Sequence, residues 1–240
     1  MREQDVELGF FVRPDSETHP GVVLVHDVWG LSEHARDLSR RLAAEGFAVL
    51  GIDLYRELGN VEIDNPGVWM RALSDPGVLA DIGAGAALLA SDPATGEHKT
   101  GVIGFCMGGM YALMAGCGSA DDAPIAAVVP FYGLLSHEHG ILYEEGGLDP
   151  SKKPRQPLDA ARELRCPLLA FFGDQDEFVP LADVQELERR LGRTGQPTEV
   201  RVYPGVGHAF VNDTRPDAYR EKEALDAWAR MVAFLRQHLS

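Results

Sequence analysis

Residues 101–109, Gly-Val-Ile-Gly-Phe-Cys-Met-Gly-Gly, decide how this chain is expected to fold. The first five are apolar and continuous, as in a strand that is buried on both faces of a sheet. The stretch then fits the pattern G-x-S-x-G, with Cys106 in place of the serine between Gly104 and Gly108. In this pattern a strand turns sharply into a helix, and side chains at the two glycine positions would clash. The stretch therefore predicts a strained turn that exposes the Cys106 sulfur beside a helix N-terminus, whose dipole favours a thiolate.

The chain has three cysteines, and their settings differ. Cys106 is interpreted as a nucleophile, and the alternative is a small thiol buried at a tight contact between strand and helix. The predicted strand before it and helix after it favour the nucleophile. Cys117 falls in the following helix and Cys166 directly precedes a predicted strand, so both are expected to be inert core thiols. An odd, sparse set predicts no disulfide framework and indicates a reducing compartment.

Apolar runs alternate with amphipathic runs on both sides of this stretch. We expect strands at residues 21–26, 47–54, 101–105, 125–131, 167–172 and 198–203. We expect helices between a capping Ser32 and a terminating Gly46, over 69–90 with a break near 75–77, over 181–191, and at the C-terminus, where residues 224, 228, 231 and 235 share one face. Strands separated by helices predict an α/β fold, a mostly parallel twisted sheet with helices on both faces. We expect residues 1–240 to form a single domain, because no linker or repeat divides them.

The composition argues against several classes of protein. Apolar residues make up 45% of the chain and charged residues 25%, as in soluble globular proteins. The formal net charge of −15 repels phosphate backbones and anionic lipids, so we expect neither nucleic acid nor a membrane as a partner. The N-terminus lacks the apolar segment of a signal peptide, which favours the cytoplasm. Metal-ligand spacings are absent from the sequence, so we expect no metal or cofactor, and a monomer or small homo-oligomer that acts on a small molecule.

Residues 136–162 interrupt the regular pattern. The segment contains His137, His139, three prolines and a double glycine. Long irregular segments in compact domains often form functional lids, whereas others are solvated surface excursions. Both interpretations stay open on the sequence alone.

A nucleophile at the turn needs a base, and the base needs a carboxylate that orients it. Asp174 and Asp176 follow the predicted strand 167–172, and the carboxyl ends of parallel strands face the ligand crevice. His208 lies in a Gly-rich loop after the last strand, so the chain order is nucleophile, acid, histidine. The spacing alone does not separate Asp174 from Asp176. His208 is favoured because only it combines this order with such a loop, and the other histidines are His19, His26, His34, His98, His137, His139 and His238.

Six motifs in order resemble the dienelactone hydrolase (carboxymethylenebutenolidase) family of α/β-hydrolases over nearly the whole chain. They are VHDVWGL (25–31), DLY (53–55), GFCMGG (104–109), FYG (131–133), GDQDEFVP (173–180) and GVGHAF (205–210). The resemblance implies a catalytic triad of Cys106, Asp176 and His208, because the family's acid stands just before an aromatic-Val-Pro sequence. It also implies an oxyanion hole made by the N–H groups of Met107 and Val28.

Two departures from the family bear on the substrate. The family typically has a glutamate, which contacts the resting thiol, where this chain has Asp27. Dienelactone hydrolases have an arginine that helps to hold the substrate carboxylate where this chain has Asn212. Trp29 and Arg71 are further candidates for substrate contacts, with Arg56 in the same general region as Arg71. We therefore expect hydrolysis of small neutral esters or lactones through a thioester acyl-enzyme.

Two alternatives are kept. The first is a general carboxylesterase or thioesterase, or a promiscuous hydrolase of other acyl-like electrophiles such as phosphotriesters. The second belongs to another class: a relative that binds a small molecule without turnover, which an intact triad argues against.

Overall fold

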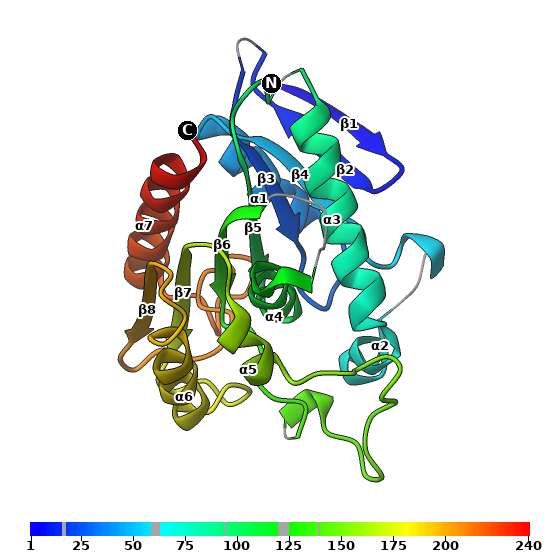
Figure 1. Cartoon of the computed structure of the whole chain (residues 1–240), viewed down its shortest axis with the longest axis vertical. Helices are drawn as coiled ribbons and strands as arrows, with labels where there is room; N and C mark the ends of the chain where they lie inside the picture. The colour runs from blue at the N-terminus through cyan, green and yellow to red at the C-terminus, as the bar shows by residue number, and fades with distance from the viewer. Residues whose placement is uncertain (16–17, 59–62, 94, 120–124, 139) are drawn as a thin grey trace.

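The computed structural model describes all residues except 16–17, 59–62, 94, 120–124 and 139. Its strands are β1 (Arg2–Val6), β2 (Gly9–Arg13), β3 (Gly21–Val25), β4 (Ala48–Ile52), β5 (Thr100–Phe105), β6 (Ile125–Phe131), β7 (Leu168–Gly173) and β8 (Thr198–Tyr203). They form one eight-stranded sheet in the order β1-β2-β4-β3-β5-β6-β7-β8 (Figure 1). Strand β2 is antiparallel to β1 and β4, and the pairs from β4 to β8 are parallel. This confirms the predicted α/β fold with a mostly parallel sheet.

Helices cover both faces of the sheet. They are α1 (Glu33–Ala44), α2 (Pro66–Ala72), α3 (Asp75–Ser91), α4 (Met107–Met114), α5 (Pro157–Ala160), α6 (Leu181–Leu191) and α7 (Glu221–Leu239), with short turns η1 (Arg56–Leu58), η2 (Ala115–Ser119), η3 (Gly140–Leu142) and η4 (Ala161–Glu163). Helices α1 and α7 pack on the face that carries Val22 and Leu24 of β3. Helices α3, α4 and α6 pack on the face that carries Val23 and Val25. Because successive side chains of a strand point to opposite faces, a continuous apolar strand such as β3 supplies both cores.

The predicted helix boundaries are largely correct. Ser32 caps α1 by accepting the N–H of Ala35 at 3.4 Å, and Gly46 follows its end with φ 96°. The predicted break lies between α2 and α3, but residues 75–77 begin α3 instead of interrupting a helix. Ser74 caps this start, and proline fits a first helical turn because its missing N–H is not needed there. No single helix in the described residues is long and apolar enough to cross a membrane, and the pair that passes this test together, α2 and α3, is bent by 80°.

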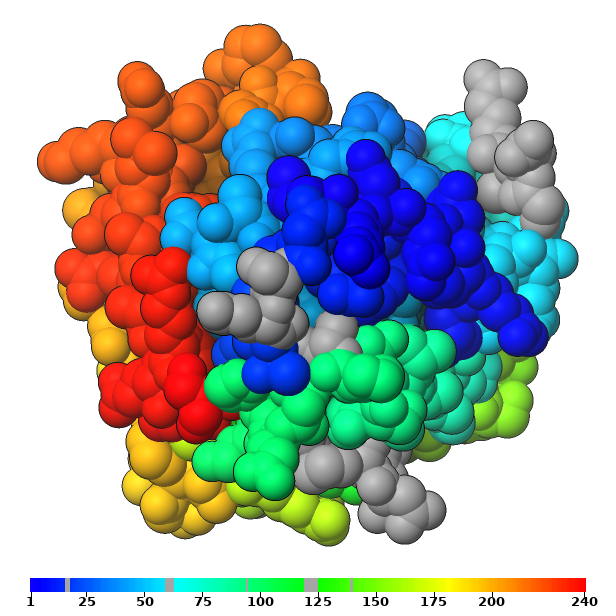
Figure 2. All heavy atoms as spheres, turned by 90° about the horizontal axis from the view of Figure 1, so that it is seen from above, coloured from blue at the N-terminus to red at the C-terminus, as the bar shows by residue number. Residues whose placement is uncertain are grey.

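The N-terminal hairpin of β1 and β2 was missed by the sequence analysis. Strand β1 is polar and mostly exposed, because it is an edge strand that pairs only with β2. It therefore carries no apolar pattern by which a strand could be recognised. Figure 2 shows this end of the molecule, with the N-terminal strands and the end of α7 on its surface. The N–H of Lys99, just before β5, bonds to the carbonyl of Leu239, so the parallel strands begin here and their carboxyl ends lie away from this face.

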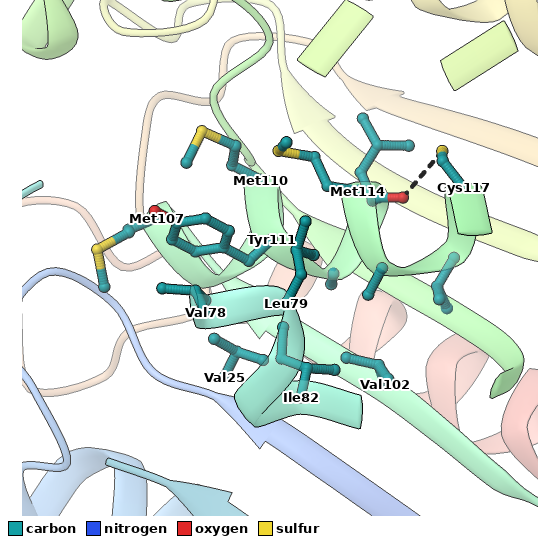
Figure 3. Close-up of a cluster of buried hydrophobic side chains, with 14 of the residues drawn as sticks. Val25, Val78, Leu79, Ile82, Val102, Met107, Met110, Tyr111, Met114 and Cys117 are labelled. Atoms are coloured by element: carbon teal, nitrogen blue, oxygen red, sulfur yellow. Dashed lines mark hydrogen bonds between the residues drawn. The ribbon is translucent and has the colours of Figure 1, made fainter. Parts of the chain in front are cut away.

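Helix α4, which follows Cys106, is buried along its whole length. Figure 3 shows its side chains packed against α3 and the strands behind it. The packing is tight at the backbone: a Cβ at Gly104 would lie 2.0 Å from the carbonyl oxygen of Gly108, and a Cβ at Gly108 would lie 2.1 Å from that of Val25. Only glycine fits at these two positions, which is the physical reason for the spacing in the motif.

The irregular segment 136–162 is attached to the body of the protein by buried polar contacts. Lys153 Nζ donates to Asp75 Oδ1 at 2.6 Å and to the Tyr111 hydroxyl at 3.0 Å, and that hydroxyl donates to Asp75 Oδ1 at 2.9 Å. The segment holds η3 and α5, and its residue His139 lies outside the described residues. Its function as a lid stays a prediction.

Candidate active site

The carboxyl ends of five parallel strands meet around one cavity of about 150 Å³. Residues that follow β3, β5, β6, β7 and β8 surround it, as expected for a crevice beyond the carboxyl ends of a parallel sheet. The cavity is lined by Asp27, Val28, Trp29, Pro66, Cys106, Tyr132, Leu134, Ile141, Phe178, His208, Ala209, Asn212 and Arg215. The walls are mainly apolar, and Asp27, Cys106 and His208 are among the lining residues.

Cys106 stands at the apex of the turn between β5 and α4 in a strained conformation, φ 55° and ψ −115°. A non-glycine residue rarely adopts such a positive φ, and strain of this kind is concentrated at functional sites. Its N–H bonds to the carbonyl of Phe131 at 3.0 Å, which fixes the turn to the neighbouring strand. Cys106 is half-buried, whereas Cys117 and Cys166 are buried, and burial raises the pKa of both of those thiols to about 12. Only Cys106 therefore reaches the cavity.

Asp176 and not Asp174 pairs with His208. Its Oδ2 accepts a hydrogen bond from His208 Nδ1 at 2.8 Å, and its Oδ1 accepts the N–H groups of Phe178 and Val179 at 2.9 and 3.1 Å. Asp174 accepts the N–H of Gly205 at 2.7 Å and so supports the loop that leads to His208. The structure thus resolves a choice that spacing had left open.

The His208 ring is buried among charged and aromatic groups. Burial alone would lower its pKa, but the charge of Cys106 and the hydrogen bond to Asp176 raise the pKa to about 10. Rings of Tyr132 and Phe178 meet it edge-on, with centroids at 4.9 and 5.0 Å. In the described chain its Nε2 is buried without a hydrogen-bond partner. Because Nδ1 is bonded to Asp176, Nε2 is the atom that can exchange a proton with the thiol or a substrate.

The loop after β3 presents Val28 to the cavity. The Tyr55 hydroxyl donates to the Val28 carbonyl at 3.2 Å and also contacts the Met107 sulfur at 3.7 Å. Asp27 Oδ1 accepts the N–H of Trp29 at 2.9 Å, so this carboxylate supports its own loop, and Asp27 also lines the cavity. Met107 itself begins α4, and its side chain is buried behind the turn. The expected oxyanion donors, Val28 N–H and Met107 N–H, are therefore on the two segments that adjoin Cys106.

His26, which directly precedes Asp27 of the cavity wall, has a supporting position. It is buried, its Nε2 accepts the N–H of Leu54 at 3.1 Å, and its Nδ1 bonds to the carbonyl of Asp27. Burial lowers its pKa, so the ring is neutral, with Nδ1 as the donor. It joins the loops after β3 and β4 and does not line the cavity.

Of the residues expected to contact the substrate, some line the cavity and others do not. Asn212 lines the cavity, but its Oδ1 accepts the N–H and the hydroxyl of Thr214 at 3.0 and 2.6 Å. Arg71 does not line the cavity; its guanidinium donates to the carbonyl of Ile141, which does. Arg56 is also outside, bonded to both carboxylate oxygens of Asp81.

Sequence reasoning missed two polar residues of the cavity, Tyr132 and Arg215. Tyr132 is part of the FYG motif, to which no role had been given. Arg215 follows Asn212 by three residues, and its N–H bonds to the Asn212 carbonyl at 3.1 Å. Its guanidinium is 46% exposed and pairs with Asp217 at 3.1 Å, a surface contact of little strength. In the described residues there is no group of three or more histidine, cysteine, aspartate or glutamate side chains that could hold a metal.

Comparisons with known proteins agree with the motifs. The family model described as "Dienelactone hydrolase family" matches residues 8–239. An Escherichia coli (strain K12) protein named "Putative carboxymethylenebutenolidase" is 32% identical over 224 residues, 91% of this chain and 77% of that one. A Bradyrhizobium protein named "Probable 2-oxo-3-(5-oxofuran-2-ylidene)propanoate lactonase" is 31% identical over 92% of this chain and 84% of that one. The crystal structure of a "Putative Dienelactone Hydrolase" from Klebsiella pneumoniae superposes with a TM-score of 0.81 at 30% identity, covering 95% of this chain and 92% of that one.

Proposed function

The chain belongs to the dienelactone hydrolase family of hydrolases, and we propose that it cleaves small esters or lactones through a thioester on Cys106. One observation carries the proposal: a buried Asp176–His208 pair beside a strained Cys106, at the edge of a mainly apolar cavity. Asp176 orients the imidazole, His208 holds the proton, and Cys106 is the nucleophile.

In the first step, the Cys106 sulfur attacks the carbonyl carbon of the substrate. His208 Nε2 takes the proton of the thiol as the sulfur attacks, and the hydrogen bond from Nδ1 to Asp176 stabilises the imidazolium that results. The negative charge that develops on the carbonyl oxygen is stabilised by the N–H groups of Val28 and Met107. Donors of this kind contribute about 3 kcal/mol each when they are removed singly.

In the second step, the tetrahedral intermediate collapses. The bond between carbon and the leaving oxygen breaks, and His208 Nε2 gives its proton to that oxygen. The thioester is then hydrolysed by a water molecule whose proton His208 accepts. Cys106 leaves as the thiolate, and the imidazolium is restored.

The cavity suits a small acyl group. Its volume is about 150 Å³, and its walls include Leu134, Ile141 and Phe178. The Oδ1 of Asn212 is already bonded to Thr214. Arg215, three residues further on, also lines the cavity, so an arginine borders it although none stands at position 212. Neutral esters and lactones remain the proposed class of substrate, and carboxylated lactones are the substrates with which they should be compared first.

The test is a panel of neutral esters, neutral lactones, carboxylated lactones, thioesters and phosphotriesters, each measured as kcat/KM with the purified protein. Peptide mass mapping after a rapid acid quench should find the acyl group on Cys106. A preference for phosphotriesters would replace the proposed substrate class. Stoichiometric binding of esters and lactones without product would show a small-molecule-binding relative and contradict the proposal.

A further inference from the structure

Tyr132 is held in a strained position next to the catalytic histidine. It follows β6, has φ 37°, and is only 2% exposed. Its N–H bonds to the Phe171 carbonyl at 2.7 Å, and its ring packs edge-on against His208 and Phe210 with centroids at 4.9 and 5.5 Å. A tyrosine at this φ costs free energy that a glycine would not, and such strain is typical of functional positions.

The Tyr132 hydroxyl makes no hydrogen bond within the described residues, and it is not among their fully buried unpaired atoms, so it is open to the cavity that the residue lines. The other three buried tyrosines all use theirs: Tyr55 donates to the Val28 carbonyl, Tyr111 to Asp75 and Tyr203 to Asp226. Tyr132 is therefore the one buried tyrosine of the described chain whose hydroxyl is available to a ligand in the cavity. A substrate oxygen in the cavity would supply the missing acceptor.

The hydroxyl is suited to donate rather than to act as a base. Burial raises the pKa of Tyr132 well above that of a free phenol, and the charges of Asp27 and Cys106 raise it further. The phenol therefore keeps its proton at neutral pH. It can offer a hydrogen bond to an oxygen that gains negative charge.

The sheet order separates this donor from the proposed oxyanion hole. The order β3-β5-β6 places the Val28 loop on one side of Cys106 and Tyr132 on the other. The carbonyl oxygen of a substrate would face Val28 and the N–H of Met107. The leaving oxygen must lie near His208, from which it takes a proton, and His208 is in contact with Tyr132.

We propose that Tyr132 is a catalytic residue that donates a hydrogen bond to the leaving oxygen of the ester or lactone. This inference rests on the proposed function. As the carbon–oxygen bond breaks, its electron pair moves to the leaving oxygen, His208 Nε2 supplies the proton, and Tyr132 keeps its own. In a lactone the leaving oxygen stays attached to the acyl chain. The hydrogen bond matters most where the leaving oxygen is most basic, as in alkyl esters.

The experiment compares Tyr132→Phe with the wild type on acetate esters whose leaving groups range from nitrophenol to simple alcohols. We expect kcat/KM to fall about tenfold on alkyl acetates and less than about twofold on nitrophenyl acetate, as for one hydrogen bond to a leaving group. The dependence of log kcat/KM on the leaving-group pKa should therefore become steeper. Tyr111→Phe, which removes a buried hydroxyl outside the cavity, is the matched control and should leave that slope unchanged.

An equal loss of kcat/KM on all acetates would mean that Tyr132 only positions His208. An unchanged kcat/KM on all of them would mean that the hydroxyl does not take part in the reaction. Either result overturns the inference. Replacing Tyr132 with 3-fluorotyrosine gives a second measurement if the phenylalanine variant does not fold. Because fluorine makes the phenol a stronger donor, the slope should become shallower, and an unchanged slope would again overturn the inference. If the wild type turns over no ester or lactone, the proposed function fails first, and that outcome is distinct from a change of slope.

Discussion

Two buried clusters in this protein contain the same three kinds of group, an aspartate, a cation and a tyrosine. Because the proposed function uses Asp176, His208 and Tyr132, we call them the catalytic cluster, and we call Asp75, Lys153 and Tyr111 the anchor cluster. In the anchor cluster all three members bond to one another through Asp75 Oδ1, the Lys153 ammonium and the Tyr111 hydroxyl. In the catalytic cluster only one such bond forms, between Asp176 and His208, while in the described chain His208 Nε2 is buried without a hydrogen-bond partner and the Tyr132 hydroxyl is open to the cavity.

This difference suits a structural role for the anchor cluster and the proposed catalytic role for the other cluster. The donors of the anchor cluster bond to other members of the cluster, and these bonds attach segment 136–162 to α3 and α4. The same segment places Ile141 in the cavity wall. Its one unused acceptor, Asp75 Oδ2, lies 3.9 Å from His137 Nε2. The catalytic cluster leaves His208 Nε2 buried and unpaired, and its Tyr132 hydroxyl is open to the cavity. A substrate in the cavity can bond to both groups.

The largest expected effect is on the nucleophile that the catalytic cluster serves. We predict that Cys106→Ala lowers kcat/KM by about 10⁴-fold or more, because no other described thiol reaches the cavity. The fold should persist, since the turn accepts a small side chain, and circular dichroism checks this. Cys117→Ala and Cys166→Ala are the controls and should keep activity. Full activity after complete alkylation of Cys106 would contradict the prediction.

The next largest effect is a difference in kcat/KM between variants of Asp176 and Asp174, two aspartates of one loop. We predict that Asp176→Asn lowers kcat/KM by about 10²-fold, less than the 10⁴-fold of a serine triad because a thiolate needs less help from the base. Asp174→Asn should cost only a few-fold, since Asp174 supports the Gly205 N–H and does not touch His208. Steady-state kinetics of both variants on one neutral ester decide this. Equal losses would place the orienting acid elsewhere.

A change in the anchor cluster should affect stability more than chemistry. We predict that Lys153→Met lowers the free energy of unfolding by about 3 kcal/mol, because it leaves the Asp75 carboxylate buried without its cation. The double variant Asp75→Leu/Lys153→Met should recover most of that loss, since it removes both charges. Urea unfolding measures the stability, and kcat per folded molecule should change little. A loss of kcat as large as that of Asp176→Asn would assign the anchor cluster a part in catalysis.

The smallest effect is a shift in pH dependence. Because the pKa of His208 is raised to about 10, its imidazolium is present below that pH and is lost as the pH rises through it. We predict that kcat/KM for a non-ionising ester falls near pH 10, where His208 can no longer protonate the leaving oxygen. Asp176 helps to raise this pKa, so Asp176→Asn should move the alkaline fall to lower pH. An unmoved profile in that variant would assign the fall to another group.

The sequence alone predicts the parts of the molecule that depend on local pattern. Continuous apolar runs identify β3, β5 and β6, and Ser32 and Gly46 mark the ends of α1. Gly104 and Gly108 predict the turn at Cys106, because the close backbone contacts at that turn exclude side chains. The exposed strand β1 was missed, since an edge strand with polar side chains lacks such a pattern.

Tertiary structure decided which side chains meet. The contact of Tyr132 with His208 and the position of Arg215 at the cavity depend on the order of the strands and on the path of each loop beyond its strand. Spacing alone left Asp174 and Asp176 open, and the family resemblance pointed to Asp176. The fold turns Asp176 toward the histidine, with its other oxygen held by the backbone N–H groups of Phe178 and Val179. Periodicity records how a segment is buried. It does not show which loops of distant strands face one another across the cavity, and the residues of the candidate site come from such loops.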